Sequence, residues 1–343
     1  MAGAFSSPSR RSRCKPTLPA SALDGRAEPR WYRRVRRMVS AVFVAIVAWL
    51  LVRYAMRLNW DEVGQALAAA PPGTLTVAAM LTVASHALYT SFDLIGRRQT
   101  RHGLSVLRTT AVAFVSYAFN LNFGAIVGGV AFRYRLYTQY GLDSPVITQV
   151  LALSVATNWL GYCLVAGLLF LLRPPSMPGG WALTVPGLRV VGALLLTAVA
   201  AYFALCALGK GRTLRWGRHC MDLPSWRLAA LQLVLSSGNW LLAAGIVQVL
   251  LGAKVEYALV TGVFLSAAIA GAVTHVPAGL GVLEAVFIAL LGQQIPAPQL
   301  VAALLAYRAI YYLAPLAIAL VGLLWSMKSR RARRARMSSS VRA

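Results

Sequence analysis

The sequence has few acidic residues and little charge of any kind. Among its 343 residues, nine are Asp or Glu and 34 are Lys or Arg, and charged residues make up 13% of the chain. A soluble domain usually carries about 25% charged residues, so the deficit argues against a soluble enzyme. Ionisable residues are costly to bury in a membrane, which makes each one inside an apolar segment a candidate functional residue.

Cysteine is also scarce, and its placement excludes two kinds of site. The four cysteines, Cys14, Cys163, Cys206 and Cys220, show neither a CxxC pair nor Cys/His spacing. We therefore expect neither a disulfide framework nor a zinc site. The sequence also lacks a Ser/His/Asp arrangement and a phosphate-cradling glycine loop. We expect no metal and no cofactor, and we do not expect this chain to be an enzyme.

Apolar residues are abundant instead, at 58% of the chain with a mean hydropathy of +0.64. They gather in eight segments: Met38–Met56, Thr74–Ile95, Leu107–Phe132, Ile147–Leu172, Leu188–Leu208, Leu228–Gly252, Tyr257–Leu291 and Leu300–Trp325. About 20 apolar residues in a helix are long enough to cross a bilayer. The sequence predicts an all-α, polytopic integral membrane protein, with a membrane domain at 38–326 between tails at 1–37 and 327–343.

The formal net charge of +25 comes largely from these two tails. Ten basic residues precede the first apolar segment and seven follow the last. Basic clusters beside membrane helices stay in the cytoplasm and attract anionic headgroups. We therefore expect both termini to be cytoplasmic, with residues 1–37 disordered. No folded module of a nucleic-acid-binding kind accompanies the tails, so nucleic acid is not an expected partner.

The placement of the other basic residues predicts that two segments do not simply cross. Eight alternating crossings would put the Lys210–Arg218 loop outside, against the positive-inside rule. This violation disappears if the third segment is a hairpin that turns at Asn120–Gly124. The seventh segment must then turn near Pro277–Gly281, which gives six full spans and two re-entrant helical hairpins. A full crossing by Tyr257–His275 is the alternative.

The third segment carries candidate substrate-binding residues at its middle and its end. They are Asn120, Asn122, Gly128, Gly129, Arg133 and Arg135. The asparagine amides either bind a polar substrate or bridge helices. The paired glycines permit close approach of a ligand or of another backbone. The arginines either grip an anionic lipid headgroup or anchor the helix end at the interface.

The seventh segment is broken in its middle, between two titratable side chains. Pro277 lacks a backbone donor, and Gly279 and Gly281 tolerate conformations that other residues resist. Broken backbone at membrane depth survives only where it is buried in protein or lines a polar cavity. His275 and Glu284 flank the break. His275 is either a proton-coupling residue or a structural histidine, and Glu284 is a substrate contact, a proton-coupling residue or a structural residue.

Glu284 must be paired or protonated, because a free buried charge is costly. One candidate partner is Arg308, which interrupts the last apolar segment four residues before Tyr312. The other candidate is Arg133. A structural ion pair, a substrate contact and proton coupling all remain open for this carboxylate.

The second segment carries a further carboxylate, Asp93. We expect it to neutralise Arg97 or Arg98 at the cytoplasmic end of the same helix. The alternative is a proton relay with His86, two turns away on the same face.

Three stretches carry a resemblance to a known family. They are Asn120–Gly129 with Arg133 and Gly141, then Val276–Glu284, and finally Arg308 with Tyr311, Tyr312 and Pro315. They resemble the N-(apolar)-G-G-x-x-x-R pattern, the P-x-G-x-G-x-x-E turn and the last helix of the flippase-like transmembrane family named after the membrane region of lysylphosphatidylglycerol synthetase. The resemblance covers residues 38–326. Val130 departs from the acidic or polar residue often found there, so no role is carried over to it.

The resemblance implies movement of an anionic phospholipid or a polyprenyl-linked lipid between the leaflets of a bacterial inner membrane. It implies a substrate site on Asn120, Asn122, Gly128, Gly129, Arg133, Arg135, Pro277, Gly279, Gly281, Glu284, Arg308 and Tyr312. No aminoacyl-transferase domain is recognisable, so lysyl transfer is not expected. A scaffold that recruits a lipid-synthesis enzyme through its basic tails is one rival interpretation, and an intramembrane lipid-modifying enzyme is another.

Overall fold

The computed structural model describes residues 70–175, 184–209, 213–216, 219–274 and 279–340, with isolated residues between 38 and 68. Most of the first expected segment, Met38–Met56, lies outside these residues, as do His275 and Pro277. The other seven expected segments all correspond to helices, with boundaries shifted by a few residues.

The helices are α3 (Pro72–Thr100), α4 (Val106–Gly124), α5 (Phe132–Gln139), α6 (Ser144–Leu172), α7 (Val185–Leu208), α8 (Trp226–Leu250), α9 (Tyr257–Thr274), α10 (Val282–Leu291), α11 (Ala297–Tyr307) and α12 (Ala314–Ser340). Two π-helical stretches, η2 (Ala125–Ala131) and η4 (Arg308–Leu313), connect α4 to α5 and α11 to α12. Between α7 and α8, β1 (Thr213–Trp216) pairs antiparallel with β2 (His219–Asp222).

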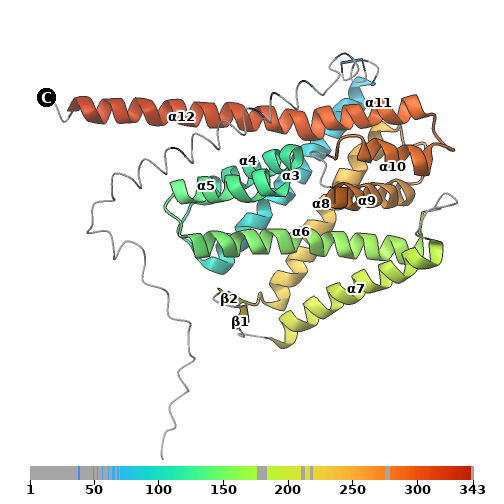
Figure 1. Ribbon diagram of the computed structural model, residues 1–343, viewed down its shortest axis with the longest axis horizontal. Coiled ribbons are helices and arrows are strands. Elements are labelled where there is room, and N and C mark those ends of the chain that lie inside the picture. Colours follow the sequence, from blue (N-terminus) through green and yellow to red (C-terminus); the bar gives the residue numbers. More distant parts are fainter. Residues whose placement is uncertain are drawn as a thin grey trace, which may run out of the picture.

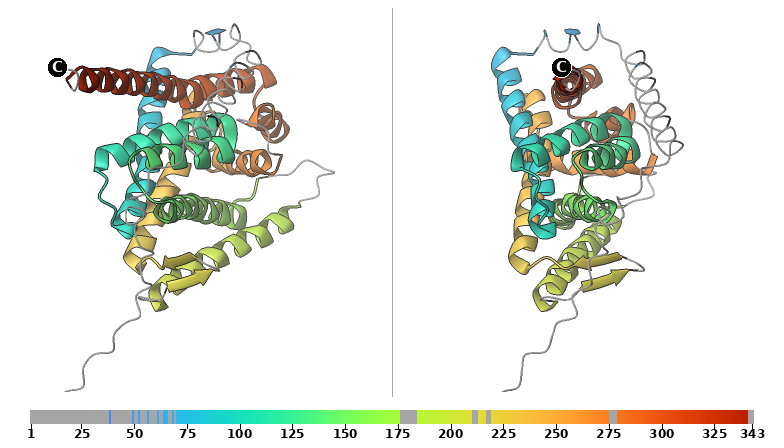
Figure 2. Two further views of the ribbon diagram at one scale, coloured as in Figure 1. Left: turned by 60° about the vertical axis from the view of Figure 1, so that its left-hand side comes forward. Right: turned by 90° about the vertical axis from the view of Figure 1, so that its left-hand side faces the viewer.

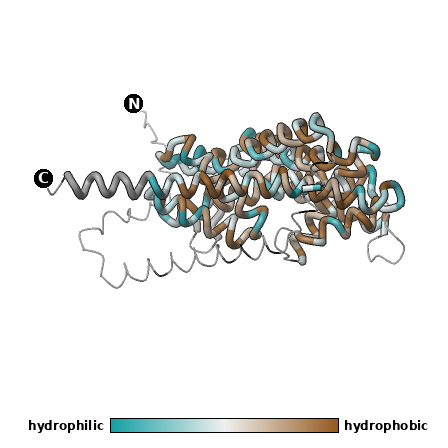
Figure 3. The backbone as a smooth tube through the Cα atoms, turned by 90° about the horizontal axis from the view of Figure 1, so that it is seen from above, coloured by the Kyte–Doolittle hydropathy of each residue, from teal (hydrophilic) through white to brown (hydrophobic). Residues whose placement is uncertain are grey.

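Seven helical segments of the described chain are long and apolar enough to cross a membrane. Apolar residues recur along these helices throughout the bundle (Figure 3). The protein is therefore the all-α polytopic membrane protein that the sequence predicts. The small β hairpin lies in the connection between α7 and α8, outside the long helices.

The third expected segment folds back on itself and forms the first hairpin, α4–η2–α5. The chain reverses at Gly124, which has a φ of +83°, and α5 lies beside α4 (Figures 1 and 2). Phe119 of α4 stacks on Phe132 of α5 with ring centroids 4.0 Å apart, whereas a straight helix would separate them by about 20 Å. The turn falls at the predicted position.

The second hairpin consists of α9 and α10, which lie side by side in Figure 1. A Cβ atom added to Gly271 of α9 would lie 3.9 Å from the Cα of Gly279, so the chain has reversed between them. Leu280, in this turn, packs against the apolar cluster that contains Phe119 of the first hairpin. The turn of the second hairpin therefore shares an apolar cluster with the first hairpin and α12.

Small residues hold the remaining helices close together. A Cβ atom on Gly161 of α6 would lie 2.2 Å from the Ser236 hydroxyl of α8, and one on Gly192 of α7 would lie 2.8 Å from the carbonyl of Gly167 in α6. Small residues at such crossings let backbones approach closely, as is typical of membrane helices. These contacts build a rigid frame beside the two hairpins.

Candidate functional site

The first hairpin places an arginine in a buried ion pair with α3. Arg133 of α5 donates from Nε to Asp93 Oδ2 at 3.1 Å and from Nη2 to Asp93 Oδ1 at 3.1 Å. The Tyr137 hydroxyl donates to Asp93 Oδ2 at 2.7 Å. The Asp93 side chain is 0% exposed and that of Arg133 is 1% exposed. We call this the Asp93–Arg133 pair.

The other donors of Arg133 are also used. Nη1 donates to the Gly129 carbonyl at 3.1 Å, and Nη2 donates to the Ser154 hydroxyl at 3.1 Å. The pair therefore connects α3, the first hairpin and α6 in one hydrogen-bonded unit. A bidentate contact with its remaining donors satisfied is the arrangement that a buried arginine requires.

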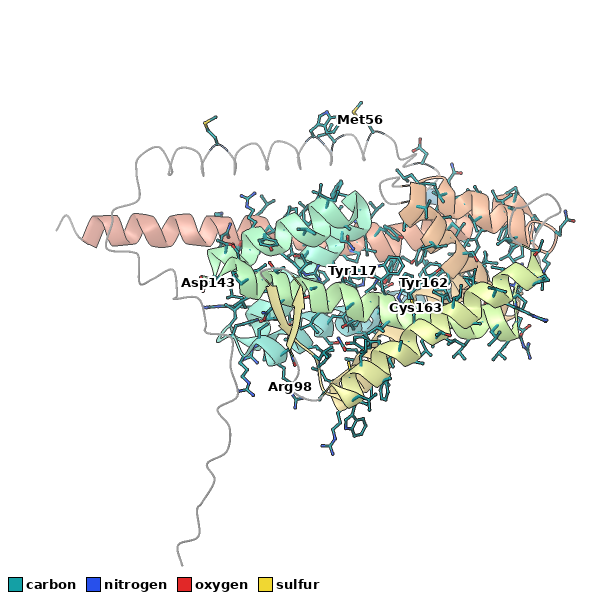
Figure 4. All side chains as sticks on the ribbon, turned by 60° about the horizontal axis from the view of Figure 1, so that its bottom comes forward. Met56, Arg98, Tyr117, Asp143, Tyr162 and Cys163 are labelled. Carbon is teal, nitrogen blue, oxygen red and sulfur yellow. The ribbon has the colours of Figure 1, made fainter. Side chains whose placement is uncertain are left out.

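The expectation that Asp93 neutralises Arg97 or Arg98 is wrong. Asp93 pairs with Arg133 instead, and the Arg97 Nε donates to the Leu104 carbonyl at 2.6 Å. Arg98 is exposed and projects at the edge of the molecule (Figure 4). Asp93 is fully buried, and Arg97, one helical turn later, bonds to a backbone carbonyl beyond the end of α3 instead.

The second hairpin forms an ion pair with η4. Arg308 donates from Nε to Glu284 Oε1 at 2.7 Å and from Nη2 to Glu284 Oε2 at 3.0 Å. Of the two candidate partners of Glu284, Arg308 is the correct one. The Arg308 side chain is 1% exposed, while that of Glu284 is 17% exposed. We call this the Glu284–Arg308 pair.

The Glu284–Arg308 pair also holds the turn of the second hairpin. Glu284 Oε2 accepts from the Gly281 backbone N–H at 3.0 Å, and Arg308 Nη2 donates to the Gly279 carbonyl at 3.0 Å. Gly279 and Gly281 have φ values of +57° and +79°, which glycine adopts without steric cost. The glycines expected from the sequence therefore shape the turn and offer its backbone groups to the charged pair.

The paired glycines of the first hairpin serve close packing. A Cβ atom on Gly128 would lie 2.0 Å from the backbone nitrogen of Asn120, and one on Gly129 would lie 3.2 Å from the Asn120 side-chain oxygen. Asn120 thus lies against the returning limb of its own hairpin. Arg135 lies two residues beyond Arg133 and so on a different face of α5, where it is half-buried.

Both arginines adjoin a π-helical stretch. Arg133 follows η2 by two residues, and Arg308 is the first residue of η4. π-helical turns are rare in proteins overall, but those that occur are often at functional sites. They change which side chains a helix presents to its neighbours. No local pattern of residues predicts either stretch.

A hydrogen-bonded chain of side chains lies between the two pairs. Ser85 donates to the side-chain oxygen of Asn239 at 2.7 Å, so Ser85 accepts from the Tyr311 hydroxyl at 2.9 Å. Tyr311 in turn accepts from Tyr117 at 2.8 Å. Figure 4 shows Tyr117 inside the bundle. The chain joins α4, η4, α3 and α8.

Aromatic stacking extends this chain toward both ion pairs. Tyr89 stacks on Tyr117 with centroids 3.4 Å apart, and the Arg133 guanidinium lies 5.9 Å from the Tyr89 ring centroid. At the other end, Arg308 lies 5.9 Å from the ring centroid of Tyr312. The tyrosines of α3 and α4 were not expected from the sequence, because a lone tyrosine in an apolar segment is an ordinary residue.

Asn122 links the first hairpin to η4. Its side-chain nitrogen donates to the carbonyls of Ala118 at 2.8 Å and Tyr312 at 3.2 Å. These two acceptors fix the orientation of the amide. Asn122 therefore contacts the backbone of Tyr312, whose ring lies beside Arg308, the partner of Glu284. The role of these residues in substrate binding stays a prediction.

Several buried polar atoms of the described residues have no hydrogen-bond partner within the protein. They include Asn122 Oδ1 and His86 Nε2, both on side chains that are under 5% exposed. His86 packs against Tyr117 and Tyr311 with centroids 5.1 and 5.0 Å away. Unpartnered buried polar groups are uncommon in proteins, so these two atoms are candidates for contact with a polar ligand. Within the described ranges, no three His, Cys, Asp or Glu side chains lie close enough to share a metal ion.

The membrane part of the chain matches known proteins over most of its length. Residues 37–319 match the family model of the lysylphosphatidylglycerol synthase TM region. The chain is 41% identical to Inner membrane protein YbhN of Escherichia coli (strain K12) over 297 residues, which cover 86% of this chain and 93% of the relative. It is 30% identical to the uncharacterized protein slr0712 of Synechocystis over 286 residues, which cover 82% of this chain and 88% of the relative.

A more distant similarity joins the chain to a longer protein. It is 24% identical over 289 residues to a phosphatidylglycerol lysyltransferase of Staphylococcus haemolyticus, and the match covers 82% of this chain but 33% of the relative. With its family-model match and its similarity to a stand-alone membrane protein, this chain belongs to the family of the lysylphosphatidylglycerol synthase transmembrane region.

Proposed function

We propose that this protein moves a phosphate-bearing lipid between the leaflets of a bacterial inner membrane. The observation that carries the proposal is the pair of helical hairpins, which share an apolar cluster and each hold a charged pair inside an apolar bundle. Discontinuous helices with buried charges are how transporters build substrate sites within the bilayer. One relative is by name a phosphatidylglycerol lysyltransferase, which favours a phospholipid as the substrate.

Physically, the protein would lower the cost of dehydrating a lipid headgroup. The charged pairs and the tyrosine chain replace hydration for the headgroup, while the acyl chains remain in the lipid. Arg308 is the proposed phosphate ligand, because a guanidinium contacts phosphate oxygens in a bidentate manner. Anionic phospholipids and polyprenyl-linked lipids both carry this group. The proposal assigns no chemical reaction to the chain, and both termini are proposed to be cytoplasmic.

The test is leaflet exchange of fluorescent lipids in vesicles that contain the purified protein. The label is on an acyl chain, so that the headgroup keeps its charge. Arg308→Gln removes the proposed phosphate ligand and should abolish the acceleration. Arg173→Gln is the matched control, because Arg173 pairs with Glu256 at the surface, with side chains 65% and 59% exposed. No acceleration by the well-folded wild type for any lipid would refute the proposal.

Proton coupling stays a prediction for Glu284 and His275. Net lipid movement in one direction requires a gradient or a coupled ion. A carboxylate in an ion pair releases its cationic partner when it is protonated, so protonation could drive such movement. Replacing both residues should remove any dependence of lipid exchange on an imposed pH gradient. Unchanged dependence in the double variant would exclude this coupling.

A scaffold is the second candidate function, and α12 favours it. This helix continues past the membrane-length part, which ends at Ser326, as far as Ser340. The extension contains most of the basic residues of the 327–343 tail, which would suit it to anionic lipid or to a lipid-synthesis enzyme. Deleting residues 1–37 and 327–343 separates the two functions: a transporter keeps lipid exchange in vesicles, while a scaffold loses its cellular role.

A further inference from the structure

The two charged pairs differ in their access to a ligand. Both side chains of the Asp93–Arg133 pair are at most 1% exposed, and Gly129, Ser154 and Tyr137 bind the donors and acceptors that the pair leaves over. The Glu284–Arg308 pair lies in the turn of the second hairpin, and its carboxylate is 17% exposed. A headgroup can therefore reach the Glu284–Arg308 pair with less rearrangement.

Opening the Glu284–Arg308 pair has a consequence for the charge of the ligand. Arg308 and Glu284 neutralise each other, so a phosphate that takes Arg308 leaves Glu284 without its cation. An unpaired carboxylate in this environment is strongly unfavourable. A headgroup that also brings a cation compensates Glu284 and restores neutrality, whereas a purely anionic headgroup does not.

Asn122 supplies an independent indication of the same chemistry. Its side-chain nitrogen is held by the Ala118 and Tyr312 carbonyls, which leaves Oδ1 as a buried acceptor without a partner. It lies against Tyr312, the residue whose ring faces Arg308. A phosphodiester offers only acceptors, so it cannot satisfy this oxygen. A primary ammonium offers three donors.

We propose, building on the lipid movement proposed above, that the Glu284–Arg308 pair opens to a zwitterionic headgroup with a phosphate and a primary ammonium. The phosphate replaces Glu284 at Arg308. The ammonium replaces Arg308 at Glu284 and donates to Asn122 Oδ1. The Asp93–Arg133 pair stays closed and holds the first hairpin while the second pair exchanges partners.

The experiment compares three lipids with the same labelled acyl chain in neutral vesicles at pH 7. Their headgroups are phosphoethanolamine, phosphocholine and phosphoglycerol. The first has a phosphate and an ammonium with N–H donors, and the second has a cation without donors. The third is anionic, with hydroxyl donors but no cation. We expect exchange of phosphoethanolamine to be faster than that of phosphoglycerol by about tenfold or more, the effect of one modest unfavourable interaction on a rate. Phosphocholine should fall between them.

Glu284→Gln should reverse the order of the first and third lipids. The substitution leaves Arg308 with an uncompensated positive charge, which favours the anionic phosphoglycerol. Glu256→Gln, the same change in the exposed Arg173–Glu256 pair, should leave the order unchanged. Asn122→Leu should lower the exchange rate of the phosphoethanolamine lipid to that of the phosphocholine lipid, because the substitution removes the acceptor for the ammonium.

Each other outcome has a defined meaning. Wild-type protein that moves phosphoglycerol as fast as phosphoethanolamine, or faster, overturns the zwitterion proposal and leaves lipid movement intact. Equal rates for phosphoethanolamine and phosphocholine overturn the role of Asn122. If no lipid moves faster than in protein-free vesicles, lipid movement itself fails, and the zwitterion proposal fails with it.

Discussion

The two hairpins look alike in outline but are closed by different interactions. The first closes on glycines that let its limbs touch, and its arginine reaches out of the hairpin to Asp93 on α3. The second also turns on glycines with positive φ, but its carboxylate caps its own turn and pairs with Arg308. One hairpin is therefore fixed to the frame of long helices, while the other is held by a pair at its own partly exposed turn.

This difference suggests separate roles for the two charged pairs. An enclosed pair with satisfied donors is a poor ligand site, because any ligand must first break several hydrogen bonds. A pair with an accessible carboxylate can exchange partners if the newcomer balances the charge. The tyrosine chain between them ties η4 to α3 and α4, so movement at Arg308 would also shift side chains beside the first hairpin.

The largest effect should come from breaking the enclosed pair. Arg133→Met leaves Asp93 buried and unpaired, and should lower the free energy of unfolding in detergent by about 3–5 kcal/mol. Adding Asp93→Leu should recover much of the lost free energy of unfolding, because an apolar pair can replace a buried ion pair. Denaturant unfolding of the three variants measures both effects. If the double variant is no more stable than Arg133→Met, the ion pair does not explain the loss.

The sequence offered Arg308 as one of two candidate partners of Glu284 but did not offer Arg133 as a partner of Asp93, and the reason is distance along the chain. Glu284 and Arg308 are separated by 24 positions, in adjacent segments that both carry local breaks. Asp93 and Arg133 are separated by 40 positions, and Arg97 offered a nearer cation. The turns of both hairpins were predictable, because the glycines that form them lie within the turn sequences themselves. The distribution of basic residues between the segments indicated which segments must turn back.

The tyrosine chain and the π-helical stretches were not predictable for the same reason. Ser85 and Tyr311 lie 226 positions apart, and nothing near either residue indicates its partner. The polar groups of a membrane bundle find partners on neighbouring helices, so these contacts depend on how the helices pack. The helices themselves could be predicted from the apolar segments alone, since the length of an apolar segment decides whether it can span a bilayer.

The next largest effect should come from crowding the first hairpin. Gly128→Ala places a Cβ atom 2.0 Å from the Asn120 nitrogen, and should destabilise the protein by about 1–3 kcal/mol through overpacking. Gly322→Ala is the matched control in α12, where no atom lies within 4 Å of the added Cβ. Thermal unfolding in detergent compares the two. Equal melting temperatures would show that the limbs are not in tight contact.

A smaller effect should follow from cutting the hydrogen-bonded tyrosine chain that joins η4 to α3 and α4. Tyr311→Phe removes a hydroxyl that bonds both Tyr117 and Ser85, and should lower the free energy of unfolding by roughly 1–3 kcal/mol. Tyr117→Phe removes only one hydrogen bond of the chain, so this substitution should lower the free energy of unfolding by about 0.5–1.5 kcal/mol. Denaturant unfolding in detergent measures both. Equal losses would contradict the assignment of two hydrogen bonds to the Tyr311 hydroxyl and one to that of Tyr117.

The smallest effect should come from the exposed pair at the base of the second hairpin. Glu256→Gln removes the partner of Arg173, and both side chains are more than half exposed. The free energy of unfolding should therefore fall by about 0–1 kcal/mol, and by less in high salt. Glu284→Gln makes the same change in a pair whose arginine is buried, and should cost more stability at every salt concentration. Equal and salt-sensitive losses from both substitutions would show that burial does not distinguish these pairs, and the role assigned to Glu284 would then have no physical basis.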